Sequence, residues 1–182
     1  MEKRALMVID AQNFIVKKGD FDEIIDKIKT LIADFEKSPN EVIFIQNITF
    51  DNPSDSFYCE KRENIGLYID PGNHKVFPKS KCNAFTNPML VQYLRQHSIG
   101  HVVITGFNTE FSCMFTAIGA DHEGFKVTFI EDACGSIADD ETYETPGLNL
   151  NNFIGTVLDW SGCVEVLYSD QYTNENEDEQ EV

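Results

Sequence analysis

The sequence predicts an α/β domain in which a mostly parallel, six-stranded sheet carries helices on both faces. Short continuous apolar runs alternate along the chain with segments whose apolar side chains recur at helical spacing. Continuous apolar runs are typical of strands that are buried on both faces, as the strands of a parallel sheet are. The 182 residues fit one domain better than two, and we assign residues 1–172 to it.

The first two strands and the helix between them show this alternation most clearly. Residues 5–9 (ALMVI) form an apolar run that ends at Asp10, and residues 42–45 (VIFI) form the second run. Between them, residues 24–35 place Ile, Leu and Phe at helical spacing, with Asp20 as the expected N-cap. We therefore expect a strand, a helix and a second strand in this order.

The connection over residues 48–73 is long for a compact domain. It is polar, contains two prolines and shows no clear period. Loops of this kind are usually functional or mobile. We expect this segment to decide substrate specificity, and the apolar residues of 57–69 to serve a subunit interface.

The second half of the chain continues the alternation. Asn87 and Pro88 fit the N-cap and the first position of a helix, whereas Gly106 and Gly124 are expected to end a strand and a helix. The expected strands are residues 76–77, 101–105, 126–130 and 164–167, and the further expected helices are residues 111–122 and 148–158.

The formal net charge of -17 restricts the partners of this chain. Nucleic acid and anionic membranes both require a basic surface, so we expect a small-molecule substrate instead. Part of the excess charge is local, because residues 173–182 (TNENEDEQEV) contain five carboxylates and no Lys or Arg. A block of like charges repels itself and rarely folds, so we expect this tail to be disordered.

The apolar stretches, cysteines and histidines indicate the cellular setting and the cofactors. No apolar stretch approaches the roughly 20 residues needed to span a bilayer, and the first residues lack a signal-peptide core. The five cysteines show no CxxC spacing, which favours a reducing cytoplasm over a disulfide framework.

The four histidines lack metal-binding spacing, and no Walker loop or GxGxxG is present. We therefore expect no metal and no cofactor.

Asp10 and Lys79 are candidates for catalysis because each stands at a predicted strand end, where ligands of parallel sheets bind. Partial burial raises the pKa of a carboxyl group, which suits Asp10 to proton transfer; a cap or turn residue is the alternative. A lysine of FPKSKCNAF, Lys79 or Lys81, is able to pair with Asp10 or to stabilise developing negative charge. Taken alone, either lysine is more often a solvated surface residue.

The segment from Gly106 to Ala117, GFNTEFSCMFTA, is the most informative part of the chain. Its pattern indicates a strand, a glycine turn and a helix start, where unpaired backbone N–H groups suit a nucleophile or an oxyanion hole. Ser112 falls at the turn and Cys113 one residue into the helix. The helix N-terminus lowers the pKa of a thiol that points into the pocket. A buried apolar thiol is the alternative for Cys113.

Three motifs together resemble the isochorismatase-like hydrolase family, also called the cysteine hydrolase superfamily, over about residues 4–168. They are ALMVIDAQNFIV, VFPKSKCNAF and VVITGFNTEFSCMFTAIGADHEGFKVTFIEDACGS. The resemblance implies a Rossmann-like three-layer αβα sandwich, a hydrolase activity, frequent homo-oligomers and an Asp-Lys-Cys triad.

The same motifs place the family's functional residues on this chain. The resemblance implies catalytic roles for Asp10 and for Lys79, which stands at the matching distance before Phe85 where Lys81 does not. Substrate binding is expected of further residues of these motifs, namely Gln12, Phe14, Phe85 and Thr109.

The nucleophile position departs from the commonest family pattern. In the amide-cleaving members a cysteine lies six residues after the glycine and four before a Thr-Ala pair, and here both counts reach Ser112, one residue before Cys113. This spacing resembles that of the true isochorismatases, which cleave a vinyl ether without a covalent nucleophile. Such chemistry makes Asp10 the general acid. The metal-binding Asp and His residues of nicotinamidases have no match in residues 46–75.

Three hypotheses follow from these residues. The first is an amide or carbamoyl hydrolase that uses Cys113, or less plausibly Ser112, as its nucleophile. The second is a nucleophile-free hydrolase with Asp10 as the acid. The third is a catalytically silent relative that binds a ligand or a partner chain.

Overall fold

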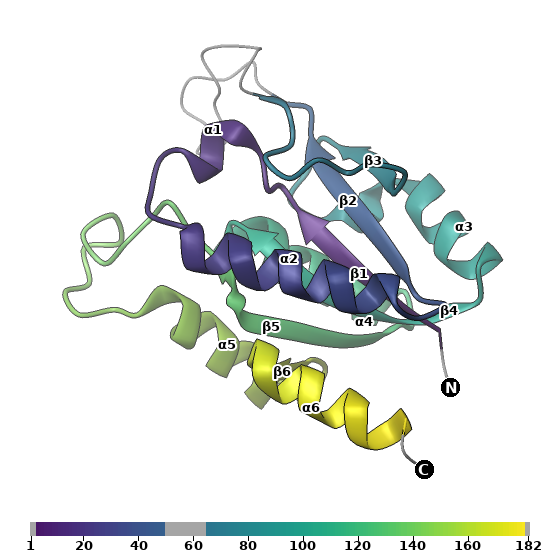
Figure 1. The fold of residues 1–182 in the computed structure, drawn as a ribbon. Coiled ribbons are helices and arrows are strands. Elements are labelled where there is room, and N and C mark those ends of the chain that lie inside the picture. Colours follow the sequence, from purple (N-terminus) through teal and green to yellow (C-terminus); the bar gives the residue numbers. More distant parts are fainter. Residues whose placement is uncertain (1–2, 50–64, 181–182) are drawn as a thin grey trace.

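The computed structural model describes residues 3–49 and 65–180 and shows a parallel sheet between two layers of helices (Figure 1). Within these residues the strands lie in the order β3-β2-β1-β4-β5-β6, and every strand pair in the sheet is parallel. The strands are β1 (Lys3–Ile9), β2 (Glu41–Asn47), β3 (Lys75–Lys79), β4 (Ile99–Phe107), β5 (Lys126–Gly135) and β6 (Glu165–Leu167). The predicted three-layer αβα sandwich is confirmed, with a sheet that is entirely parallel.

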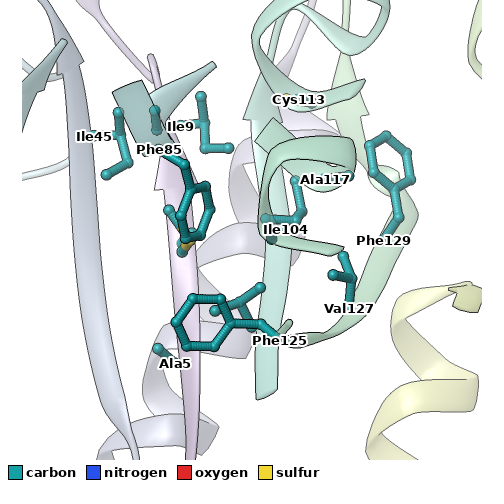
Figure 2. Packing of buried hydrophobic residues seen from close by; sticks show 14 of the residues in the cluster. Ala5, Ile9, Ile45, Phe85, Ile104, Cys113, Ala117, Phe125, Val127 and Phe129 are labelled. Carbon is teal, nitrogen blue, oxygen red and sulfur yellow. The ribbon is translucent and has the colours of Figure 1, made fainter. Parts of the chain in front are cut away.

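The helices divide between the two faces of the sheet. They are α1 (Asn13–Val16), α2 (Asp22–Glu36), α3 (Pro88–Gln96), α4 (Met114–His122), α5 (Leu150–Trp160) and α6 (Ser169–Gln180). Buried side chains of α3, α4 and α5 join one apolar cluster, which Figure 2 shows in part, and those of α1, α2 and α6 join a second. Alternate residues of β1 enter opposite clusters, Met7 the first and Val8 the second, so residues 5–9 of the strand are all apolar. None of the helices in the described residues is long and apolar enough to cross a membrane.

Asp20 does not cap helix α2, contrary to the prediction from the sequence. The helix begins at Asp22 with Phe21 at the N-cap position, which makes no side-chain cap hydrogen bond. The ring of Phe21 packs edge-on against Phe107, with 4.9 Å between the ring centroids. Aromatic packing rather than capping therefore accompanies the start of this helix. The predicted cap at Asn87 is confirmed by its side-chain hydrogen bond to the first turn of α3.

Gly106 lies inside β4 and does not end it, because the strand continues to Phe107. Its backbone pairs with Ile9 of β1 on one side and Cys134 of β5 on the other. Gly106 has a φ of 117°, and a Cβ atom at this position would overlap the carbonyl oxygen of Ile9. The close approach of β1 and β4 therefore requires glycine.

The centre of the sheet is a topological switch point. β1 and β4 are neighbours there, and the strands that follow each of them lie on opposite sides. Ligands of open α/β sheets bind outside the carboxyl ends of the strands at such a point. Asp10 directly follows β1, and residues 108–113 directly follow β4. The topology thus brings two of the predicted strand ends to one place.

Helix α6 extends through residues that the sequence predicted to be a disordered tail. The Asp132 carboxylate accepts hydrogen bonds from the backbone N–H and the hydroxyl of Ser169, at 2.7 and 2.9 Å, and so caps the helix. Tyr172 is buried and stacks on Phe35, with 6.1 Å between the ring centroids. These contacts anchor the first turn, and the helix continues to Gln180. The assignment of residues 1–172 as the domain stays a prediction.

We predict that Gly106→Ala lowers the free energy of unfolding by about 3 kcal/mol or more, because the new methyl group collides with the β1 backbone. Gly124→Ala is the matched control, since Gly124 also has a positive φ, 84°, but no atom lies within 4 Å of its added Cβ. The control is expected to cost only about 1 kcal/mol. Urea denaturation of both variants measures the difference, and equal losses would contradict the steric explanation.

Candidate active site

Asp10 and Lys79 form a buried ion pair at the carboxyl edge of the sheet. Lys79 Nζ lies 2.7 Å from Asp10 Oδ2, and the two side chains are 1% and 0% exposed. Lys79 is the last residue of β3, and β2 separates that strand from β1. The lysine side chain therefore spans the end of β2 to reach Asp10. Asp10 itself adopts a left-handed backbone with a φ of 48°, which is unusual for a residue with a side chain.

Ser112 is the third member of this group. Lys79 Nζ donates a hydrogen bond to Ser112 Oγ at 2.9 Å and another to the backbone carbonyl of Lys81 at 3.2 Å. Lys81 thus contributes its backbone and not its ammonium group. The structure brings together Asp10, Lys79 and Ser112, as the motif spacing predicted for the nucleophile position.

A π-helical turn over Thr109–Cys113 sets the direction of the Ser112 side chain. The backbone carbonyl of Asn108 accepts hydrogen bonds from the N–H groups of Phe111 and Cys113, at 3.2 and 3.1 Å. Turns of this wide type are rare and often occur at functional sites. The predicted helix over 111–122 therefore begins with a π turn, and the regular α-helix starts at Met114.

Burial raises the pKa of the Asp10 carboxyl group above its ordinary value. The positive charge of Lys79 and hydrogen bonding from Lys79 and Ser112 oppose this shift, but desolvation is the largest contribution. Asp10 therefore keeps its proton to a higher pH than an exposed aspartate does. A carboxyl group with this property is suited to act as a general acid near neutral pH.

Cys113 lies in the apolar core, within electrostatic reach of Asp10 and Lys79. It belongs to the cluster under α3, α4 and α5, and Figure 2 shows it there with Ala117 and Ile104. Burial, together with the neighbouring Cys134 thiol, raises the pKa of Cys113 well above its ordinary value. The prediction that the helix N-terminus lowers this pKa is therefore wrong. The alternative, a buried apolar thiol, describes Cys113.

Gln12 is buried and holds two backbone segments together. Its side-chain N–H groups donate to the carbonyl oxygens of Asn47, at 3.2 Å, and Ile65, at 2.6 Å. Its side-chain oxygen accepts from the Asn47 N–H at 3.0 Å. The Gln12 amide thus forms hydrogen bonds to the backbone. These contacts favour a positioning role for Gln12 over the predicted contact with the substrate. Residues 50–64, which include most of the predicted specificity and interface segment, lie outside the described residues.

The other three predicted substrate-binding residues also have structural contacts. Phe14 is buried in the second apolar cluster. Phe85 packs on Phe125 in the first cluster, with 5.6 Å between the ring centroids (Figure 2). Thr109 Oγ1 donates to Asn151 Oδ1 at 2.7 Å. These contacts orient the elements around Asp10 and Ser112 and leave direct substrate contact by Phe14, Phe85 and Thr109 as an untested prediction.

Two polar residues that the sequence analysis did not single out lie in the same loop. Asn108 and Glu110 are buried, with 1% and 6% of their surfaces exposed. They stand directly before Ser112 in GFNTEFSC, and their polar character within a largely apolar segment was the available signal. Thr116 was also missed as a contact residue, although its hydroxyl accepts from the Ala84 N–H at 3.1 Å. This bond ties α4 to the loop that follows Lys79.

No group of three or more His, Cys, Asp or Glu side chains in residues 3–49 and 65–180 is arranged to hold a metal ion. The part of the nicotinamidase-type metal motif that would fall on residues 50–64 lies outside the described residues.

Comparison with known proteins relates the chain to one family. The isochorismatase domain model matches residues 4–161. The uncharacterised isochorismatase family protein YwoC of Bacillus subtilis (strain 168) is 26% identical over 158 residues, which cover 77% of this chain and 82% of that protein. Isochorismatase family protein 2B of Dictyostelium discoideum is 30% identical over 148 residues, which cover 73% of this chain and 62% of that protein.

Solved structures share the fold at lower sequence identity. An isochorismatase-like hydrolase from Alkaliphilus metalliredigens gives a TM-score of 0.75 at 20% identity, covering 94% of this chain and 95% of that one. The nicotinamidase SaPncA from Staphylococcus aureus gives 0.72 at 21% identity, covering 91% of this chain and 99% of that one. Because the domain model spans most of the sequence, the chain belongs to the isochorismatase family of hydrolases, as its three motifs predicted.

Proposed function

We propose that the protein hydrolyses a small molecule without a covalent nucleophile and that Asp10 is the general acid. The observation that carries the proposal is that Ser112 stands at the nucleophile position and accepts a hydrogen bond from Lys79, which pairs with Asp10, whereas the Cys113 thiol is buried in the apolar core with a raised pKa. A vinyl ether is the substrate class that suits this arrangement, because protonation of a carbon atom takes the place of nucleophilic attack by the protein.

Asp10 begins the reaction as a neutral carboxylic acid. It transfers its proton to the enol-ether carbon, and the ether oxygen shares the positive charge that results. Water adds to this cation and loses a proton, which restores the carboxylic acid. The hemiketal that forms then separates into an alcohol and a carbonyl product. Burial supports the first step because it raises the pKa of Asp10 and keeps the acid form available.

Lys79 stabilises the carboxylate that forms when the proton leaves Asp10. Its ammonium group lies 2.7 Å from Asp10 Oδ2, and water is excluded from both side chains. Charge attraction is strong in such a dry environment and requires no rearrangement during the reaction. Lys79 thus lowers the free energy of the charged state that follows proton transfer.

Ser112 acts as a positioning residue in this scheme. Its oxygen accepts a hydrogen bond from Lys79 at 2.9 Å, so the lysine is a donor to the hydroxyl and not a base that removes its proton. A serine hydroxyl needs a strong base to become a nucleophile. Lys79 is therefore not that base, and a protonated Asp10, which its raised pKa favours, does not accept the proton of Ser112 either.

A catalytically silent relative remains the alternative, because Ser112 occupies the usual nucleophile position. The Asp10–Lys79 contact favours catalysis, because titratable side chains that are buried together and have a perturbed pKa are typical of functional sites. A homo-oligomer and a cytoplasmic location stay predictions from the sequence.

We predict that Asp10→Asn lowers the rate of vinyl-ether hydrolysis by about a thousandfold or more, because the amide has no acidic proton to transfer. Ser112→Ala, the matched control, is expected to lower it by no more than about tenfold, since no covalent bond to the serine is formed. The measurement is product formation from a panel of vinyl ethers, followed by proton NMR, with circular dichroism to verify folding.

Other results would contradict the proposal. Full activity of the Asp10→Asn variant removes the general acid from the mechanism. Ammonia release from simple amides by the unmodified protein, lost in Cys113→Ala, would establish covalent amide hydrolysis instead. A protein that turns over neither vinyl ethers nor amides would support the silent relative.

The pH dependence follows from the acid form of Asp10. Because the reactive species is protonated and its pKa is raised, kcat/KM is expected to be constant at low pH. It falls by about tenfold per pH unit once the pH exceeds the pKa of Asp10. A rate profile from pH 4 to 9 tests this; a rate that rises with pH would indicate that Asp10 acts as a base.

Cys113 is predicted to react with iodoacetamide about a hundredfold more slowly than Cys163, because Cys113 is buried with a raised pKa whereas Cys163 is exposed to the reagent. Mass spectrometry of peptides after timed alkylation measures both rates in one sample. Cys163→Ser is the control that removes the fast site. Rapid alkylation of Cys113 would place its thiol in the pocket and revive the thiol mechanism.

A further inference from the structure

Buried polar atoms without a hydrogen-bond partner are concentrated in the loop between β4 and Ser112. They are Nδ2 and Oδ1 of Asn108 and Oε2 of Glu110. Apart from the carboxylate of Asp10, which pairs with Lys79, no other buried side-chain atom in residues 3–49 and 65–180 lacks a partner. The unsatisfied groups therefore lie in the same turn as Ser112 of the candidate active site.

Such groups are costly in a folded protein. A buried donor or acceptor that loses its partner costs about 1–3 kcal/mol, so the great majority are satisfied. Asn108 stands at the N-cap position of the π turn, where an asparagine side chain usually accepts a backbone hydrogen bond, yet it makes none. The backbone carbonyl of Asn108 accepts hydrogen bonds within the turn, but its side chain forms none. A ligand that forms hydrogen bonds with the side-chain amide offsets this cost.

Glu110 is oriented by two hydroxyl groups. Its Oε1 atom accepts from Ser136 Oγ at 2.9 Å and from the Tyr143 hydroxyl at 3.1 Å. Burial, together with the Glu110 carboxylate, raises the pKa of Tyr143 to about 12, so Tyr143 remains a donor. The second oxygen, Oε2, keeps its capacity to accept one more hydrogen bond.

The three unused atoms define the chemistry of a complementary ligand. Asn108 offers the two N–H donors of its amide nitrogen and one acceptor oxygen, and Glu110 offers a carboxylate oxygen that accepts only. A complementary ligand therefore presents both O–H or N–H donors and acceptor atoms. A second carboxylate on the ligand would be repelled by Glu110, and the nearby Lys79 is already paired with Asp10.

We propose that Asn108 and Glu110 recognise the substrate, and that they select a neutral small molecule bearing hydroxyl or amide donors over a dicarboxylate. The inference deepens the proposed function, because it rests on the same site and names the class of substrate that the site admits. Asn108 contacts the substrate through its amide, and Glu110 accepts a hydrogen bond from it.

The first test uses the stability of the free protein. Asn108→Leu, which has nearly the same shape, removes an unsatisfied amide and is expected to raise Tm by about 2–4 °C. Asn151→Leu is the matched control, because Asn151 bonds to Thr109 and to the Cys134 carbonyl, and it is expected to lower Tm. A lower Tm of the Asn108→Leu variant would show that the Asn108 amide stabilises the free protein, and this result would overturn the proposal.

The second test measures binding without turnover and does not depend on the leucine variant folding. Glycolamide, a neutral probe with hydroxyl and amide donors, is titrated into labelled unmodified protein and followed by the NMR signals of the Asn108 side-chain amide. Malonate is the dicarboxylate comparison. Glycolamide is expected to shift these signals and malonate to leave them unchanged. Shifts with malonate, or none with glycolamide, would overturn the proposal.

The two proposals fail in distinguishable ways. If Asp10→Asn stays active, the general-acid mechanism is wrong, but the Asn108 signals still report whether the loop binds glycolamide. If glycolamide leaves those signals unchanged while Asp10→Asn is inactive, the mechanism stands and the recognition residues lie elsewhere.

Discussion

The buried ion pair between Asp10 and Lys79 constrains the whole carboxyl edge of the sheet. Both side chains lose their hydration on folding, and their mutual contact offsets that loss. The pair joins the end of β1 to the end of β3, and Lys79 extends the connection to Ser112 after β4. Removal of either partner would leave an uncompensated charge in a dry environment. The geometry of the site and the packing of this edge therefore have a common determinant.

The local sequence pattern predicted the features that depend on burial and on spacing along the chain, such as the strands. The apolar runs predicted the strands, because a residue such as Met7 or Val8 is buried whichever face of the sheet it enters. The count from Gly106 led to Ser112, which contacts Lys79; its role at the nucleophile position stays a prediction. The Asp20 cap failed because a distant ring, Phe107, packs where the helix starts.

The roles of the other residues near the site depend on tertiary contacts, which the sequence pattern does not show. A motif identifies residues that a family retains, but it does not separate those that touch the ligand from those that support its neighbours. Gln12 illustrates this limit, because its amide bonds to backbone groups at positions 47 and 65, which no local pattern brings together. The unsatisfied state of Asn108 is equally invisible in a sequence. It can be recognised only in three dimensions, where no atom of residues 3–49 and 65–180 forms a hydrogen bond with the Asn108 side chain.

The hydrogen bonds of Gln12 have a consequence for how this protein can diversify. One amide group holds both flanks of the segment 50–64, through Asn47 on one side and Ile65 on the other. Insertions, deletions or substitutions between these two anchors need not disturb the residues around Asp10. The contact of Asp10 with Lys79 is therefore held by residues outside this segment. Related chains can differ in its length or composition and still hold the two side chains together.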